Sequence, residues 1–516
     1  MPTADYALHI DWDEDGDFDD PAETLSRDVI AAEWALGLAR AADSVAAPSW
    51  AVLTLRDPAR RYTPENPDGP LYGSLTPRKK VRLTSTHGGL TRVHFTGWTE
   101  SFTPNADRTT LLRCAGVEAL LERAEVFLPL GLNRRADQVI AAVLAQVAYP
   151  PALSGYWLLG TARLGRSTRL PHTTTYADLE AGLSVFAYVG DNWGDGVSAW
   201  GAIRAAAEAE RGRCFVDRSG RVVFWNRHHL PKQTAVAASL TGQEAEFAVG
   251  YDGRDLVNRA VVTCHPRDVG SSPQALWTLA APLAIPPGGS RTVRARFTDQ
   301  SGARVGGLDL VTPVAGVDYQ ANAAPDGSGD DLTASVSVTL VEPAASSAVL
   351  TFSNSGLRTA YVLAGAVLRG LRLADWGPLD AEYADQTSIT LYGRRTLGLD
   401  LPLLSDAEEA ARLARHLVVE GRDPRGRVEA VTLRNTTSAD ALAALLGLTL
   451  GHRITLSDAR SGHQRDYHII GERHALRRGG AEHETTWTLA PASPVTYWRL
   501  GVTGAGELGT ATRLAY

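Results

Sequence analysis

The first acidic stretch of the chain carries the clearest pattern with a possible chemistry. The segment DWDEDGDFDD begins at Asp11 and places aspartates at alternate positions, namely Asp11, Asp13, Asp15 and Asp17, with Gly16 at the turn. Alternating carboxylates converge when a chain wraps a calcium ion, and glycine permits the sharp turn. The position of the bidentate glutamate of an EF-hand holds an alanine, and no flanking helix pair is evident. The segment is therefore either a calcium loop outside the EF-hand class or an acidic surface turn.

Other residues that could do chemistry lack a supporting pattern. Four histidines near the C-terminal end follow no metal-ligand spacing: His463, His468, His474 and His483. Asp191 and Asp195 flank Trp193 and could suit a glycosidase, but they are a single pair in a glycine-rich loop. Phosphate-binding, nucleophile-elbow and zinc-protease motifs do not occur in the sequence. We therefore expect no enzymatic activity and no cofactor beyond a structural calcium ion.

Composition indicates a soluble globular chain of several domains. Its 516 residues correspond to about three to five domains. The hydrophobic fraction is 44%, the charged fraction is 21%, and the net charge is −7. This balance gives no basic footprint for sequence-specific nucleic-acid binding, and no apolar run reaches membrane-spanning length. The three cysteines are far apart and odd in number, which argues against a disulfide framework.

Short strand-like segments near the start recur, in the same order, near the end. LTLRD from Leu53 corresponds to VTLRN from Val431, and KKVRL from Lys79 corresponds to HRITL from His452. HFTG from His94 corresponds to HIIG from His468, and TTLLRCAG from Thr109 corresponds to TTWTLAP from Thr485. Apolar and polar residues alternate along them, which is typical of half-buried strands. Four matches in order indicate a duplicated β module, in which Val81 aligns with Ile454 and Gly97 with Gly471.

The remaining segments complete an α+β, β-rich fold class: two similar β-barrel modules, small helical elements and an inserted β-sandwich. The sandwich is predicted because short alternating runs recur there without helical periodicity. The expected domains are residues 1–125 (first barrel module), 126–265 (α/β connecting domain), 266–378 (inserted sandwich), 379–492 (second barrel module) and 493–516 (extended C-terminal strand segment).

Two segments are expected to bind partners. The proline-rich loop from Thr63 to Gly73 is too long for a simple hairpin, and it offers Tyr62, Leu71 and Tyr72 as apolar anchors. The C-terminal segment repeats a pattern seen from Tyr156 to Leu170, and it offers Tyr497, Trp498 and Leu500. We expect it to dock as an added strand, because free strand edges recruit partners.

The segments LRDPARRYTPENPDGPLYGSL and PRKKVRL resemble the N-terminal region of tail-tip and baseplate hub proteins of tailed bacteriophages and tail-like particles. The strand-turn IDWDEDGDF and the C-terminal order DPRGRVEAVTLRN, LGLTLGHRITL and DYHIIGERHALRRGG resemble the same family. The resemblance covers both ends of the chain, while the sandwich-like middle matches loosely. It carries over no catalytic residue, because the shared motifs are turns and strands.

The resemblance implies a structural role in the virion, at the tail tip, after assembly in the host cytoplasm. A hub of this family forms a homotrimer that closes the tail tube. Its partners are a distal tail ring protein or the tube, the tape-measure protein, and tail fibre or tip proteins. Two alternatives remain: a distal tail ring or receptor-binding minor tail protein, and a tail-associated cell-wall hydrolase.

Overall fold

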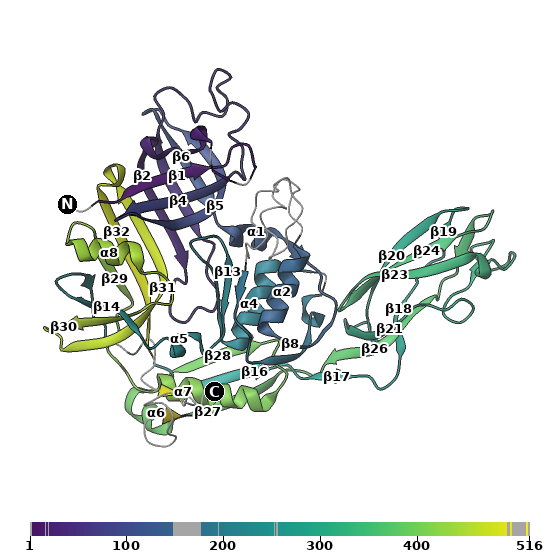
Figure 1. Cartoon of the computed structure of the whole chain (residues 1–516). Coiled ribbons are helices and arrows are strands. Elements are labelled where there is room, and N and C mark those ends of the chain that lie inside the picture. Colours follow the sequence, from purple (N-terminus) through teal and green to yellow (C-terminus); the bar gives the residue numbers. More distant parts are fainter. Residues whose placement is uncertain are drawn as a thin grey trace.

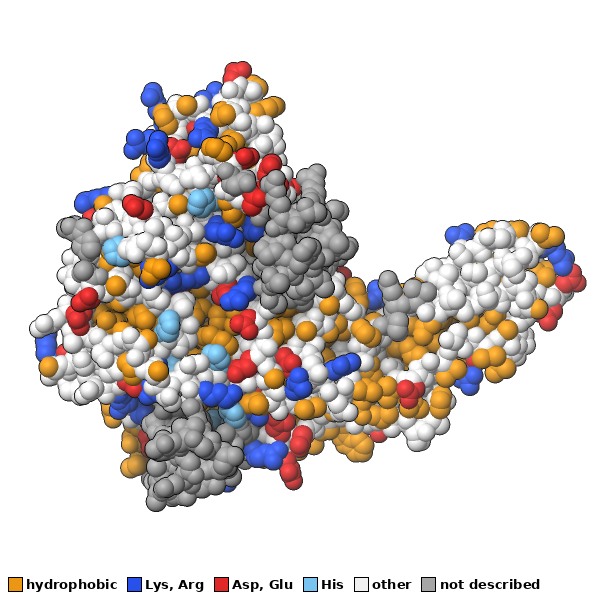
Figure 2. Space-filling model, in the orientation of Figure 1, with side chains coloured by type: hydrophobic (Ala, Val, Ile, Leu, Met, Phe, Trp, Pro, Cys, Tyr) orange, Lys and Arg blue, Asp and Glu red, His pale blue; other side chains and the backbone are white. Residues whose placement is uncertain are grey.

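The chain folds into two neighbouring β modules, an α/β domain beside them, and a β arm that points away from these three parts (Figure 1). The computed structural model describes residues 3–15, 17–18, 20–147, 177–194, 196–251, 253, 256–492, 496–497 and 512–513. Figure 2 shows the arm standing clear of the rest, with charged side chains of both signs scattered over the visible face. Among the described residues, no helix is both long and apolar enough to cross a membrane.

The first module is an antiparallel sheet in the order β1-β4-β5-β6-β3-β2. Its strands are β1 (Asp5–Ile10), β2 (Val29–Gly37), β3 (Trp50–Arg56), β4 (Lys80–His87), β5 (Leu90–Pro104) and β6 (Thr109–Ala115). Burial alternates along β2 and β3, so Trp34, Leu53 and Leu55 enter the core. Two short 3₁₀ turns, Pro21–Glu23 and Ser26–Asp28, precede β2.

The second module has the order β14-β30-β31-β32-β29-β15. Its strands are β14 (Val236–Thr241), β15 (Glu246–Phe247), β29 (Ala430–Arg434), β30 (Arg453–Asp458), β31 (His463–Arg477) and β32 (Glu482–Pro491). Helix α8 (Ala439–Gly447) follows β29, and the Ser438 hydroxyl caps its N-terminus by accepting from Ala441 N at 3.0 Å. The first module has the proline-rich loop at this position.

The central four strands of the two modules share one order, β4-β5-β6-β3 and β30-β31-β32-β29. The residue after β3, Asp57, donates its backbone N–H to the carbonyl of Arg108 at 2.8 Å, and the residue after β29, Asn435, donates in the same way to His483 at 3.0 Å. The segments LTLRD and VTLRN therefore align residue for residue, as the sequence comparison predicts.

The register of the next strand pair agrees with the prediction only in part. Val81 lies opposite Gly97, whereas Ile454 lies opposite Tyr467. Val81 and Ile454 are thus equivalent, but Gly97 corresponds to Tyr467 and not to Gly471. The expected alignment of the two glycines is wrong by four residues. Both strands are long, and a shared His-x-x-Gly motif does not determine which residues of two long strands are equivalent.

The two modules are joined into one twelve-stranded sheet, because β2 pairs antiparallel with β31. In the described part of the chain no sheet closes on itself, and β1 stays an edge strand of the first module. The fold is β-rich as predicted, but the two closed barrels are not supported. The second neighbour of β2 is a strand of the other module instead of β1.

The α/β domain packs helices α1 (Val117–Arg123), α2 (Ala136–Gln146) and α4 (Ala199–Glu210) around the fully buried Trp200. Its short strands are β7 (Glu125–Val126), β8 (Gly131–Arg135), β9 (Ala177–Leu179), β10 (Val185–Val189), β11 (Val197–Ser198), β12 (Arg213–Val216) and β13 (Val222–Trp225), followed by α5 (His229–Lys232). The β12–β13 hairpin packs into the core of this domain, and its turn contacts both modules.

Strand pairing crosses the domain boundaries expected from sequence. β14 and β15 lie within 126–265 but belong to the second module. β16 (Arg259–Cys264) pairs with β27 (Leu379–Ala384) and β28 (Thr396–Leu401), under helix α7 (Ala407–Gly421), with α6 (Gln386–Tyr392) between the last two strands. The chain returns to earlier parts of the fold after the arm, and local composition carries no signal of that return.

The arm contains β17 to β26 in three small sheets around one apolar core. Its strands are β17 (Arg267–Val269), β18 (Gln274–Thr278), β19 (Leu283–Ile285), β20 (Ser290–Arg296), β21 (Gly306–Val311), β22 (Ala321–Asn322), β23 (Val336–Ala344), β24 (Ser347–Asn354), β25 (Ala360–Val362) and β26 (Val367–Asp375). At its base the buried Arg267 donates to Asp191 at 2.6 Å, and Ala345 N donates to Leu128 O at 2.9 Å. These bonds tie the arm to the α/β domain.

Candidate functional site: the junction of the modules

The module junction is the backbone contact between β2 and β31. Ala32 lies opposite Leu476 at one end, and Gly37 lies opposite Gly471 at the other. A Cβ on Gly471 would lie 2.1 Å from the carbonyl oxygen of Leu38, so only glycine permits this approach. Gly471, which sequence comparison assigned to a repeated motif, is thus a junction residue.

A buried histidine cluster lies beneath this junction. Trp34 of β2 stacks on His474 of β31 at a ring distance of 4.6 Å and an angle of 7°. His474 Nδ1 lies 3.0 Å from His483 Nε2, and His483 Nδ1 lies 2.6 Å from the Tyr6 hydroxyl of β1. His94 of β5 completes the cluster. Three strands of the first module and two of the second therefore meet in one cluster, in which the histidines and Trp34 are buried and Tyr6 is half-buried.

Burial sets the charge state of this network. It lowers the pKa of His94, His474 and His483, and the Arg218 guanidinium lowers them further. The rings are therefore neutral at neutral pH and can each donate and accept a hydrogen bond. Hydrogen bonds of this kind favour one packing arrangement, although Trp34 Nε1 and His94 Nδ1 have no hydrogen-bond partner among the described residues.

Arg218 locks the second module to the α/β domain. It lies at the turn of the β12–β13 hairpin and donates from Nε and Nη2 to the two carboxylate oxygens of Glu472, each at 2.6 Å. Its Nη2 also donates to the carbonyl of Leu448, at 2.8 Å. Burial alone would raise the pKa of Glu472, but the charge of Arg218 outweighs it and holds that pKa at about 2. The neighbouring Gly220 lies against Thr96 of the first module, so one hairpin touches both modules.

Three of the four predicted metal ligands come together. Ligand oxygens of Asp11, Asp13 and Asp15 lie within 4.8 Å of one another, and Asp17 lies outside this group. The backbone N–H of Asp17 donates to Asp15 at 3.1 Å. Alternate aspartates around a turn are a fit for calcium by donor type.

The surroundings of this loop are partly buried and charged. Burial raises the pKa of Glu23 to about 7, and the negative charges of Asp11 and Asp13 raise it as well. Hydrogen bonds from the N–H groups of Asp20 and Trp12 lower this pKa in part. Lys79 donates to the Trp12 carbonyl at 2.7 Å and to Glu14 at 2.8 Å. The loop is thus tied to the first module whether or not an ion binds.

The predicted partner anchors separate into two groups. Tyr62 and Leu71 are buried in the first module, because the proline-rich loop folds back over its own core, and Tyr62 donates to Asp28 Oδ2 at 2.5 Å. They cannot face a neighbour as expected. Tyr72 is 59% exposed, so its side chain is accessible to a neighbouring protein.

The C-terminal anchors are only partly described. Tyr497 belongs to the two-residue strand β33 (Thr496–Tyr497), which pairs in parallel with β34 (Thr512–Arg513). Trp498, Leu500 and the segment from Tyr156 to Leu170 lie outside the described residues. The prediction of an added strand on a larger sheet therefore stays a prediction.

The weak catalytic candidates find structural partners. Asp191 pairs with Arg267 at the base of the arm, and Asp195 lies outside the described residues. His468, His474 and His483 are buried, while Tyr467 Oη lies 3.0 Å from His463 Nε2. Sequence reasoning found these histidines but missed the partners of His474 and His483, which are Trp34 and Tyr6. No local signal could have found them, since each partner comes from a distant segment of the chain.

No protein-family model matches this sequence, and no curated protein matches it either. Among solved structures, the chain is similar to a 43 kDa tail protein of prophage MuSo2 from Shewanella oneidensis, at 10% identity and a TM-score of 0.46, with 94% of this chain and 98% of that one covered. It is similar to a tail protein from Neisseria meningitidis MC58, at 9% identity and a TM-score of 0.46, with 95% and 98% covered. It is also similar to a component of the Escherichia coli type VI secretion system, described as similar to T4 bacteriophage tail proteins gp27 and gp5, at 11% identity and a TM-score of 0.34, with 90% and 74% covered.

Proposed function

We propose that this chain is a structural tail-tip protein, the baseplate hub of a tailed bacteriophage or tail-like particle. The observation that carries the proposal is the repeated module joined edge to edge within one chain. Among the described residues, β15 ends the sheet on one side, and the end of β5 beyond Trp98 has β6 as its only strand partner. Unpaired strand edges of this kind recruit further strands.

Three copies would satisfy these edges in a closed ring of six modules. Each contact between copies would repeat the β2–β31 strand pairing found within the chain. In that contact β15 of one chain would lie beside β5 of the next. A closed ring leaves no open end. It also matches a six-fold tail tube to a three-fold tip, which is the role that the sequence resemblance implies.

The face of the joined sheet that points away from the cores of the modules suits the lining of a channel. Its side chains include Thr54, Thr432 and Thr486, and two of its arginines pair with carboxylates: Arg473 with Glu33 at 3.2 Å, and Arg434 with Glu484 at 2.7 Å. Pairing of this kind reduces the number of cations that the face offers to phosphates. The tape-measure protein and nucleic acid would pass over it, the tube or distal ring would sit above, and the fibres below.

Counting the copies in an assembled particle, by imaging at subunit resolution, tests the hub. Three copies with the modules in one ring are expected. Six copies would favour the distal tail ring protein.

The arm favours one second candidate, a receptor-binding minor tail protein, because a projecting sandwich is accessible from outside (Figure 2). Deleting residues 266–378 should then abolish adsorption but leave the ring intact. A cell-wall hydrolase is the remaining alternative, and a cleared band in a cell-wall zymogram would favour it over both.

A further inference from the structure

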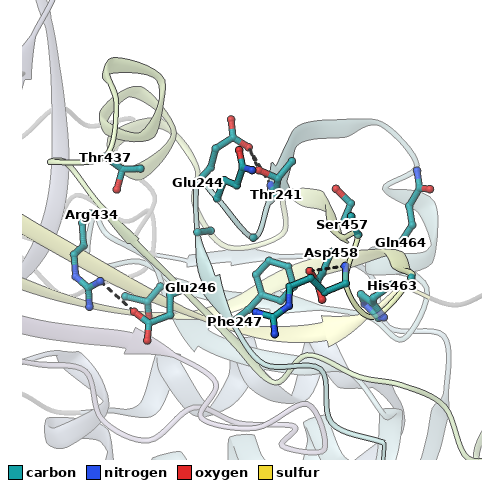
Figure 3. A pocket seen from close by; sticks show the side chains of 17 residues that line it. Thr241, Glu244, Glu246, Phe247, Arg434, Thr437, Ser457, Asp458, His463 and Gln464 are labelled. Carbon is teal, nitrogen blue, oxygen red and sulfur yellow. Dashed lines mark hydrogen bonds and ion pairs between the residues drawn. The ribbon is translucent and has the colours of Figure 1, made fainter.

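The free edge of the second module contains a hollow of about 930 Å³ (Figure 3). The turn from Thr241 to Glu246 forms one wall, and the tip of the β30–β31 hairpin, with Asp458 and His463, forms another. Arg434 of β29 lies at its edge and pairs with Glu246 at 3.1 Å. The hollow therefore lies beside β15, the strand that ends the sheet.

The corresponding place in the first module is occupied from the second module. The short turn Arg478–Gly480, at the end of the β31–β32 hairpin, packs beside the start of β2. A Cβ on Gly479 would lie 3.9 Å from the carbonyl oxygen of Val29, and one on Gly480 would lie 3.0 Å from the Tyr6 ring. At the junction within the chain, a hairpin tip of one module thus docks where the next module begins its edge strand.

The first module has an equivalent hairpin between β5 and β6. Both hairpins shift register at the same place, between Thr99 and Ser101 and between Ile469 and Gly471. Both tips also contain an arginine with positive φ, Arg108 at 63° and Arg478 at 52°. The Arg478 tip is docked, whereas residues 104–108 of the other tip are exposed.

We propose that the β5–β6 hairpin tip, Pro104–Thr109, of one copy docks into this hollow on a second copy. This inference rests on the proposed ring and names its contact. The tip carries one charge of each sign, Asp107 and Arg108, and the hollow carries both carboxylates and arginines, among them Glu244 and Arg460, so pairs of opposite charge can form in the contact. The first module receives its docked tip beside the start of β2, whereas the second module has only a short turn before β15, and the hollow there is open to an incoming tip.

Disulfide cross-linking of the full chain tests the contact. Ala106→Cys and Gln243→Cys, both at exposed positions, should together give covalent species of up to three chains under mild oxidation. The native cysteines, Cys114, Cys214 and Cys264, are buried and give little background. The matched control combines Ala106→Cys with Leu357→Cys on the arm, where Leu357 is 96% exposed, and should give no such species.

Mass measurement on the same samples separates this contact from the ring itself. Three copies together with the cross-link support both. Three copies without the cross-link overturn the hairpin contact and leave the ring standing. A chain that stays monomeric over the whole concentration range and forms no cross-link overturns both, whereas equal linking in the control overturns the hairpin contact alone.

Discussion

The two modules share a strand frame and differ in what fills it. The first closes its core with its own loops, which supply Leu25, Tyr62 and Leu71. The second packs Ala444 of helix α8 against its core, while the buried leucines of α8 lie against Ala4 and Tyr6, and it places a buried ion pair, Arg218 with Glu472, at its junction. A duplicated frame can thus be stabilised by local apolar packing in one copy and by distant polar contacts in the other. The second module should therefore be the one that depends on the rest of the chain.

Removing Arg218 should have the largest effect. Arg218→Ala leaves the carboxylate of Glu472 buried without a countercharge, which costs about 3–5 kcal/mol of unfolding free energy. Denaturant unfolding would measure the loss. Hydrogen exchange should rise in β31 and β32 before it rises in β3 and β6.

Arg221 in the same hairpin provides the control. It is half-exposed, and within the described part of the chain its ion pair is with Asp217, so Arg221→Ala should cost less than about 1 kcal/mol. Equal losses in both variants would mean that the hairpin itself, and not the buried pair, holds the second module.

Chelation should act on the first module alone, because the acidic loop has no counterpart in the second. If calcium binds at Asp11, Asp13 and Asp15, its removal should lower the unfolding free energy by about 2–3 kcal/mol when calcium is far above its dissociation constant. The melting temperature with and without chelator measures this. Asp13→Asn should abolish the shift, and Asp68→Asn in the exposed loop should keep it. An unchanged melting temperature in the natural chain would leave an acidic turn.

Acid should destabilise the second module through its buried histidines. Burial lowers the pKa of His468 to about 4, and His474 and His483 are lowered as well. The unfolded chain, with an ordinary histidine pKa of about 6.5, takes up protons first as the pH falls. The stabilisation is therefore present above pH 6.5 and is lost toward pH 4, on the order of 2 kcal/mol at pH 5 for His468 alone.

Unfolding curves at pH 7.5 and pH 5 would show this loss. His468→Gln should reduce the pH dependence, and His87→Gln, at the surface hairpin of the first module, should leave it unchanged. A flat stability profile between these pH values would contradict the neutral, buried state of His468, His474 and His483.

Sequence reasoning recovered the parts of the fold that are local. The match of LTLRD with VTLRN was correct because both end on a strand whose next residue keeps the pairing, at Asp57 and Asn435. The match of Gly97 with Gly471 failed because β5 and β31 are long strands with bulges, along which a short motif can slide. The closeness of Asp11, Asp13 and Asp15 was predicted because these carboxylates are near one another in sequence.

The parts that were missed depend on long-range contacts. Arg218 and Glu472 are 254 positions apart, and Tyr6 and His483 are 477 apart, so no window of sequence contains either pair. The same holds for the β2–β31 pairing, which converts two expected barrels into one sheet. Edge strands look alike in sequence whether they close a barrel or join a neighbour.

Substitution of Tyr72 should change the unfolding free energy least. It also tests directly whether the proline-rich loop contacts a neighbouring protein. Its neighbour in the loop, Tyr62, is buried and bonded to Asp28, so Tyr62→Phe should cost about 1 kcal/mol of unfolding free energy. Tyr72 is largely exposed, so Tyr72→Ala should change that free energy by less than about 0.5 kcal/mol. If the loop reaches a neighbour, Tyr72→Ala should nevertheless weaken assembly, whereas Tyr62→Phe should not. Assembly would be followed as the fraction of chain recovered in multimers at a fixed concentration. Equal recovery of the natural chain and Tyr72→Ala would mean that the loop serves only its own module, as Tyr62 and Leu71 already do.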